Sequence, residues 1–171
     1  VPLMLEAQGL CATLGLKVQT NGLLDDWRRM AHHLDALEEN VTIAMVGKYT
    51  DLSDAYLSVI KALQHAAMAA NRKLTIDWLE AGELEHGVPD DVHADAWKRL
   101  RAADGILVPG GFGHRGVEGK ILAASYARTN GVPYFGICLG LQVAAIEFAR
   151  NVLGMEGSTS TEFDEDCPNP A

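Results

Sequence analysis

The clearest chemical signal in the sequence is a cysteine placed between two glycines. Its thiol belongs to the pentapeptide Gly136-Ile137-Cys138-Leu139-Gly140. Glycines two residues before and two residues after a nucleophile are typical of a nucleophile elbow, the tight turn that joins a strand to a helix. Side chains at the glycine positions would fill the room that such a turn needs. The spacing therefore predicts an exposed, nucleophilic Cys138.

The helix expected to follow this turn would favour the reactive form of the thiol. Unpaired N–H groups and the positive end of the helix dipole stabilise a thiolate relative to a thiol. The alternative is a buried, inert cysteine at the end of an apolar strand, because free cysteine is among the most buried residue types. The two flanking glycines favour the nucleophile.

A second segment with chemical potential is a glycine-rich run, PGGFGHRG, over residues 109–116. Glycines this dense let the backbone approach a ligand, and consecutive N–H groups can stabilise a developing negative charge as an oxyanion hole. The alternative is a flexible surface turn. For this run alone, the surface turn is at least as good an interpretation. The cysteine elbow predicted in the same sheet adds support for the oxyanion hole.

Alternating strand and helix patterns supply the frame for these two loops. Short apolar runs predict strands at Val41–Val46, Leu74–Leu79, Gly105–Val108 and Tyr134–Ile137. Periodic apolar residues predict helices at Leu24–Leu37, Asp51–Asn71, Val92–Ala103, Val117–Asn130 and Leu139–Leu153. Repeats of this kind predict an α/β fold, with a parallel sheet and helices on both faces. Ligands of such sheets lie at the carboxyl ends of the strands, where both loops begin.

Composition and charge limit the classes of function. The chain has 171 residues, of which 48% are hydrophobic and 22% charged, as in ordinary soluble globular domains. Its formal net charge of -9 argues against nucleic acid and anionic membranes as partners. The apolar opening, residues 1–18, is interrupted by Glu6, Gln8 and Lys17, and is predicted to be neither a membrane span nor a signal peptide.

The cysteines indicate the compartment. Cys11, Cys138 and Cys167 show no metal-ligand spacing, so no metal site is expected. An odd count without signs of secretion favours free thiols in a reducing, cytoplasmic environment. The sequence begins with Val1 and ends in the polar run Asp164–Ala171, so we expect that both ends are cut from a longer chain.

Four segments, in this order, resemble the glutaminase domain of the CTP synthase family, a class I glutamine amidotransferase domain. They are VGKYTDLSDAYLSVIKAL at 46–63, PGGFGHRG at 109–116, GICLGLQ at 136–142 and STEF at 160–163. The resemblance implies a flavodoxin-like class I amidotransferase fold, incomplete at its C-terminus. Residues 1–40 would be the tail of a synthetase domain and the linker helix. Residues 41–171 would form the N-terminal part of the amidotransferase domain.

The resemblance also implies a reaction. Cys138 would attack the side-chain amide of L-glutamine, form a glutamyl thioester and release ammonia, with backbone N–H groups of Gly111 and Leu139 as the oxyanion hole. The glutamine-binding positions would be Gly111, Leu139, Gly140, Leu141, Gln142 and Glu162. Without the resemblance, a solvated acid of an acidic tail would be the preferred interpretation of Glu162. Gln142 is equally consistent with a helix surface residue.

In the family, a lid beside the glutamine site responds to the activator GTP. The matching residues are Phe112, Arg115, Gly116 and Glu118. A guanidinium suits phosphate, so Arg115 is the expected anion partner, and a surface ion pair is the alternative. No cofactor is expected in this domain. ATP, UTP and magnesium would belong to the synthetase domain of the same chain, which is absent from this sequence.

A cysteine amidotransferase also needs a base, usually a histidine oriented by a carboxylate. All the histidines precede the nucleophile, and none matches the family's base: His32, His33, His65, His86, His93 and His114. The base and its glutamate are expected beyond Ala171. The 171-residue stretch alone is therefore predicted to turn over glutamine poorly or not at all.

The resemblance has a consequence for assembly, and two other classes of protein are alternatives to it. The full-length enzyme of the family is expected to be a homotetramer assembled mainly through the synthetase domain, and this stretch alone to be monomeric. A different cysteine-elbow α/β protein would lack the segment GKYTDLSDAY at 47–56. A regulatory or assembly domain that keeps the elbow without a base is a third possibility.

Overall fold

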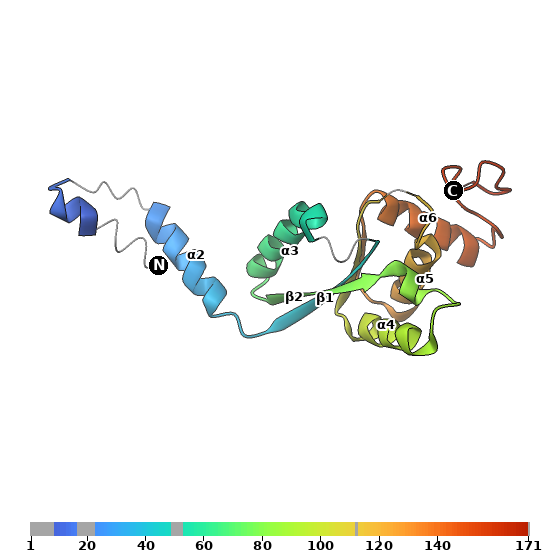
Figure 1. Ribbon diagram of the computed structural model, residues 1–171, viewed down its shortest axis with the longest axis horizontal. Coiled ribbons are helices and arrows are strands. Elements are labelled where there is room, and N and C mark those ends of the chain that lie inside the picture. Colours follow the sequence, from blue (N-terminus) through green and yellow to red (C-terminus); the bar gives the residue numbers. More distant parts are fainter. Residues whose placement is uncertain (1–8, 17–22, 49–52, 112, 171) are drawn as a thin grey trace. The chain divides into compact units, whose positions relative to one another are not determined.

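The computed structural model describes residues 9–16, 23–48, 53–111 and 113–170 (Figure 1). Contacts divide the chain into two compact units, Val1–Glu39 and Asn40–Ala171. In the first unit, helix α2 (Leu23–Asp35) confirms the helix predicted from the apolar periodicity and ends two residues earlier than expected. The apolar side chains Trp27, Met30 and Leu34 are exposed.

The second unit is built on a parallel sheet with the strand order β2-β1-β3-β4. The strands are β1 (Asn40–Gly47), β2 (Lys73–Glu80), β3 (Gly105–Val108) and β4 (Tyr134–Gly136). All three pairings are parallel, with Ala44 opposite Ile106 and Val108 opposite Gly136. The predicted parallel sheet is therefore confirmed, with strand ends shifted by at most one residue.

Helices connect successive strands, and a last helix follows β4. They are η1 (Ser53–Tyr56), α3 (Leu57–Ala69), η2 (Ala81–Leu84), α4 (Asp90–Ala102), α5 (Val117–Asn130) and α6 (Leu139–Asn151). The step from β1 to β2 runs in one direction along the sheet, and the next two steps run in the other. Right-handed crossovers therefore place α3 on one face and α4 and α5 on the opposite face. Figure 1 shows α3 apart from α4 and α5.

Two connections differ from the expectation. The helix predicted over Asp51–Asn71 begins, in the described part, as the 3-10 turn η1, and Asp51 itself lies outside the described residues. The short 3-10 helix η2 was not predicted, because a four-residue turn carries no apolar periodicity. Leu84 at its end is fully buried, so this turn packs into the core.

The hydrophobic core lies on the side of the sheet covered by α4, α5 and α6. Its central members come from the strands and these three helices: Val46, Leu79, Leu100, Ile106, Val108, Ile121, Leu139, Val143 and Ile146. Within α3, in contrast, Ala67 is the one buried residue among those described. The side chains that fix the two chemically interesting loops therefore come mainly from the α4–α6 side.

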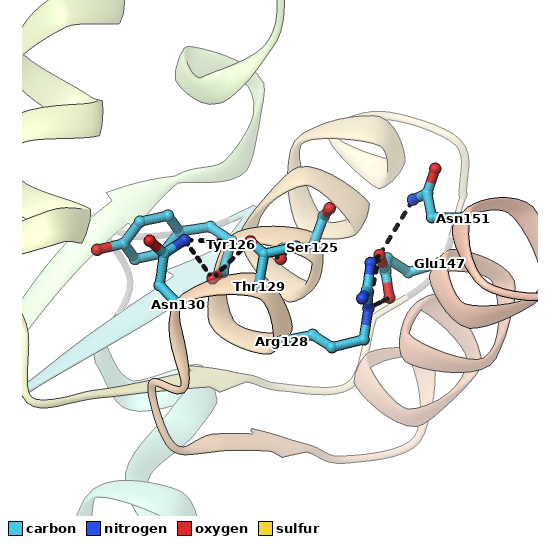
Figure 2. Close-up of polar contacts among 7 residues, drawn as sticks. All are labelled: Ser125, Tyr126, Arg128, Thr129, Asn130, Glu147 and Asn151. Atoms are coloured by element: carbon cyan, nitrogen blue, oxygen red, sulfur yellow. Dashed lines mark hydrogen bonds and ion pairs between the residues drawn. The ribbon is translucent and has the colours of Figure 1, made fainter.

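An ion pair fixes α6 against α5, as Figure 2 shows. Arg128 of α5 donates from Nε and Nη2 to the carboxylate of Glu147, with distances of 2.7 to 3.2 Å. The Glu147 side chain is only 3% exposed, and Asn151 donates to it at 3.0 Å. The hydrogen bonds from Arg128 lower the pKa of Glu147, against the opposing effect of burial. This pair holds the helix that begins directly after Cys138.

A candidate cysteine nucleophile site

The backbone at Cys138 has the geometry of a sharp turn between a strand and a helix. Strand β4 ends at Gly136, and α6 begins at Leu139. Between them, Cys138 has φ 55° and ψ -109°, and it is exposed. Apart from Asn71, it is the one non-glycine residue in the described part of the chain with a positive φ. Such strained positions concentrate at functional sites, because the surrounding structure must hold them in place.

The two flanking glycines have steric reasons to be glycines. A Cβ placed on Gly136 would lie 2.3 Å from the carbonyl oxygen of Gly140. A Cβ on Gly140 would lie 2.1 Å from the carbonyl oxygen of Val108. Both distances are far shorter than a carbon–oxygen contact permits. The turn thus packs its own backbone against the end of β3, and only glycine fits at either position.

The glycine-rich segment after β3 passes directly beside the thiol. A Cβ on Gly110 would lie 3.4 Å from Cys138 Cβ and 3.8 Å from its Sγ. A Cβ on Gly111 would lie 3.6 Å from Leu139 Cδ2. The structure therefore brings together the three residues predicted for the nucleophile and the oxyanion hole: Cys138, Gly111 and Leu139.

Tyr134 supports the first turn of α6, and sequence reasoning did not identify it. Its hydroxyl donates to the carbonyl oxygen of Gly140 at 2.7 Å. Burial raises the pKa of this phenol, so it stays neutral and remains a donor. The tyrosine occurs in an otherwise apolar strand just before the elbow. Its polar end therefore needed a nearby acceptor.

The residues predicted to form a lid contact neighbouring elements. Arg115 Nη2 lies 3.3 Å from Glu80 Oε1 at the end of β2, and its side chain is 69% exposed. Gly116 has φ 75°, and a Cβ there would lie 3.0 Å from Ala81 Cβ, which favours glycine. Phe112 lies outside the described residues.

An ion pair joins the start of α5 to the end of α6. Arg150 Nη1 donates to both carboxylate oxygens of Glu118 at 2.9 Å. Its Nε donates to the carbonyl oxygen of Ser158 at 2.5 Å. Sequence reasoning included Glu118 among the lid residues but did not identify Arg150, because nothing local in the sequence links residues 118, 150 and 158.

A buried lysine lies beneath the glycine-rich segment. Lys120 is 2% exposed, and its Nζ lies 3.8 Å from the Cβ position of Gly111. Burial lowers the pKa of Lys120, nearby Lys48 lowers it further, and Glu80 raises it. Sequence reasoning missed this residue. The available signal was one lysine among the buried apolar residues of α5.

The residues predicted to bind glutamine come from two places. Leu141 and Gln142 are exposed in the first turn of α6. Glu162 is exposed in a turn of the C-terminal segment, where its N–H donates to Ser160 Oγ at 3.2 Å. The ring of the adjacent Phe163 packs edge-on against His114, with centroids 5.6 Å apart. Among the described contacts, none joins Glu162 directly to Cys138.

Two further observations concern ligands and membranes. Within the described ranges, no cluster of three or more histidine, cysteine, aspartate or glutamate side chains could hold a metal ion. None of the described helices combines the length and the apolar character that crossing a bilayer requires.

Comparison with known proteins relates this geometry to a family. The family model for class-I glutamine amidotransferases matches residues 51–166. CTP synthase 2 of Saccharomyces cerevisiae is 56% identical over 154 residues, which cover 88% of this chain and 27% of that protein. Human CTP synthase 1 is 46% identical over 179 residues, covering 99% of this chain and 30% of that protein. The chain thus spans about a quarter to a third of the length of these curated relatives.

A solved structure matches the fold as well. It is described as the Trypanosoma brucei CTPS glutaminase domain with bound acivicin. It superposes with a TM-score of 0.69 at 45% sequence identity, covering 76% of this chain and 48% of that one. The class I amidotransferase fold expected from the resemblance is therefore confirmed. With a family model that matches most of its length, this chain belongs to the class I glutamine amidotransferases.

Proposed function

We propose that this chain is the glutamine-hydrolysing domain of a CTP synthase, with Cys138 as its nucleophile. The observation that carries the proposal is the strained, exposed Cys138 beside Gly110 and Gly111. The similarity to CTP synthases over nearly the whole chain supports the choice of overall reaction. That reaction is the ATP-dependent amination of UTP to CTP, fed by ammonia from glutamine.

In the proposed mechanism, the Cys138 thiolate adds to the carboxamide carbon of L-glutamine. The carbonyl oxygen becomes an oxyanion, which accepts hydrogen bonds from the backbone N–H groups of Gly111 and Leu139. The carbon–nitrogen bond then breaks, the nitrogen takes a proton, and ammonia leaves a glutamyl thioester. Water hydrolyses the thioester to glutamate and restores the thiol.

The remaining groups are assigned by role. Gly140, Leu141, Gln142 and Glu162 complete the glutamine site, and the Glu162 carboxylate pairs with the substrate ammonium group. The general base and its carboxylate partner come from a part of the enzyme outside this sequence. The synthetase domain, with ATP, UTP and magnesium, likewise lies outside it. We place the complete enzyme in the cytoplasm as a homotetramer.

The same proposal gives the lid residues Phe112, Arg115, Gly116 and Glu118 a role in GTP activation. Arg115 is exposed, and its contact with Glu80 is a single long one, at 3.3 Å. A weak, solvated ion pair of this kind is readily exchanged for a phosphate group. GTP would thus compete with Glu80 for the guanidinium.

The test is Cys138→Ala in the full-length protein that contains this sequence. Glutamine-dependent CTP formation should fall by about a thousandfold or more, since removal of a nucleophile has effects of this size or larger. CTP formation from added ammonia should continue at the wild-type rate, which also shows that the variant folds. Equal loss of both activities, or retention of glutamine-dependent activity, would contradict the proposal.

A further inference from the structure

Arg150 joins three segments that the proposed site needs. It lies near the end of α6, the helix that begins after Cys138. Its Nη1 reaches Glu118 in the first turn of α5, and its Nε reaches the carbonyl oxygen of Ser158 in the C-terminal segment. The Arg150 side chain is 24% exposed, so much of it is removed from water. One side chain thus connects α6, which begins at the elbow, with α5 and with the C-terminal segment.

The C-terminal segment, residues 152–170, forms no regular element of its own. It contains an isolated bridge between Thr159 and Pro170. Ser158 is fully buried, and its N–H donates to the carbonyl oxygen of Met155. Its hydroxyl is the one buried side-chain polar atom without a partner in the described structure. The Arg150 contact therefore adds a side-chain attachment to a backbone that forms no helix or strand of its own.

A second contact links the same two regions. His114, in the lid loop before α5, packs edge-on against Phe163. Phe163 packs against the hydrophobic core from its partly buried position. Glu162 lies between these two attachments, next to Phe163 and four residues after Ser158. The position of its carboxylate therefore depends on both.

We propose that Arg150 is a positioning residue for glutamine binding. It places Glu162 by holding residues 158–163 against the start of α5. The inference rests on the proposed function, because it assumes that Glu162 binds the ammonium group of glutamine. Arg150 acts through backbone and carboxylate contacts and touches no substrate. Its geometry suits this role, because Nε and Nη1 point in fixed directions from one planar group and serve two acceptors at once.

The experiment compares Arg150→Met and Arg150→Lys in the full-length enzyme. Both variants should raise KM for glutamine about tenfold, equivalent to ~1.4 kcal/mol of binding. The kcat should change less than KM, because the elbow and the oxyanion hole remain. A lysine ammonium cannot occupy the positions of Nε and Nη1 together, so Arg150→Lys should not restore KM. CTP formation from added ammonia should be unchanged in both.

Arg128→Met supplies the matched control. Arg128 also forms an α5–α6 ion pair, with Glu147 (Figure 2), but makes no described contact with residues 155–170. Its loss should lower the melting temperature and leave KM for glutamine within about twofold. This separates a general loosening of the two helices from a specific effect on the C-terminal segment.

Three outcomes would overturn the inference: an unchanged KM in Arg150→Met, full recovery of KM in Arg150→Lys, or an equal rise in Arg128→Met. Failure of the proposed function is a different result. It would appear in the wild-type protein, as an absence of glutamine-dependent activity that requires Cys138. A wild-type enzyme that passes the Cys138 test while the Arg150 variants bind glutamine normally would therefore contradict only the positioning role.

Discussion

The elbow around Cys138 and the segments that surround it are fixed by different forces. At the elbow, backbone packs on backbone, and added Cβ atoms at Gly136 or Gly140 would lie 2.3 or 2.1 Å from carbonyl oxygens. The predicted lid and the C-terminal segment are instead held by side-chain contacts, among them Arg115 with Glu80 and Arg150 with Glu118. Steric contact tolerates almost no displacement, whereas ion pairs with one exposed member, here Arg115 or Glu118, can break and reform.

This difference matches what each region must do in the proposed reaction. A nucleophile has to be held within a fraction of an ångström of its productive position, because small displacements reduce the rate steeply. A lid and a substrate-binding segment have to admit glutamine and release glutamate. Four substitutions test the comparison, from the largest expected effect to the smallest.

The largest effect is expected for Gly140→Ala. The new methyl group would have to displace α6 from the carbonyl oxygen of Val108 at the end of β3. We expect a loss of stability of about 3 kcal/mol, at the upper end for overpacking, and a loss of most glutaminase activity. Thermal unfolding measures the loss of stability, and glutamine turnover by the full-length enzyme measures the loss of activity. Gly82→Ala is the control, because nothing lies within 4 Å of its Cβ position; similar damage from both would contradict the steric account.

Glu147→Gln tests the polar contact that fixes the elbow helix itself. Hydrogen bonds from Arg128 lower the pKa of Glu147 in the folded state. The carboxylate therefore stabilises the fold at pH values above the ordinary glutamate pKa of about 4.3. This stabilisation is lost as the pH falls through the lower pKa that Glu147 has in the folded state. The variant should melt several degrees lower than wild type at pH 7, and the difference should shrink at pH 3.

Melting curves between pH 3 and 7 measure the Glu147 effect. Glu165→Gln serves as the control, since Glu165 is exposed in the C-terminal segment. A constant difference between Glu147→Gln and wild type at every pH would show that the carboxylate charge contributes nothing.

Lys120→Met should act in the opposite direction and increase stability. Burial lowers the pKa of Lys120, so its charge is unfavourable in the folded state at neutral pH. Replacing a buried charge by an apolar side chain of similar length should add about 1 kcal/mol. The gain should disappear above pH 10.5, where the lysine is neutral in both states. Denaturant unfolding at pH 7 and pH 11 tests this, and a destabilised variant at pH 7 would show that the ammonium group supports the glycine-rich segment.

The smallest effect on stability is expected for Arg115→Ala. The pair with Glu80 is 69% exposed on the arginine side, so its loss should cost less than about 1 kcal/mol. Activation by GTP should be lost in the full-length enzyme, while glutamine turnover without GTP changes little. Activity measured over a range of GTP concentrations gives the answer. Unchanged GTP activation would remove Arg115 from the effector site.

The sequence predicted the frame well because the frame depends on local patterns. Apolar runs located β1 to β4 to within one residue at each end, and the periodicity of α5 located both its ends. The elbow was also predictable, because its glycines lie two residues from Cys138. These signals come from residues that are close together in the chain, so they can be recognised before the fold is known.

The residues that were missed depend on contacts between distant segments. Tyr134 needs the turn to bring Gly140 to its hydroxyl, Lys120 needs the segment at Gly111 above it, and Arg150 joins Glu118 to Ser158. No spacing in the chain predicts such pairs. They became visible only when the sheet order brought β3 and β4 side by side and α5 against α6.

The most direct test of the central claim is the reactivity of Cys138 itself. Intact mass should be measured after exposure of the protein to a diazoketone analogue of glutamine, with Cys138→Ala as the control. The account predicts a single adduct that requires Cys138 and is prevented by excess glutamine, with Cys11 and Cys167 unlabelled. Equal labelling of the three cysteines, or no adduct at Cys138, would contradict the claim that the elbow presents a nucleophile to a glutamine site.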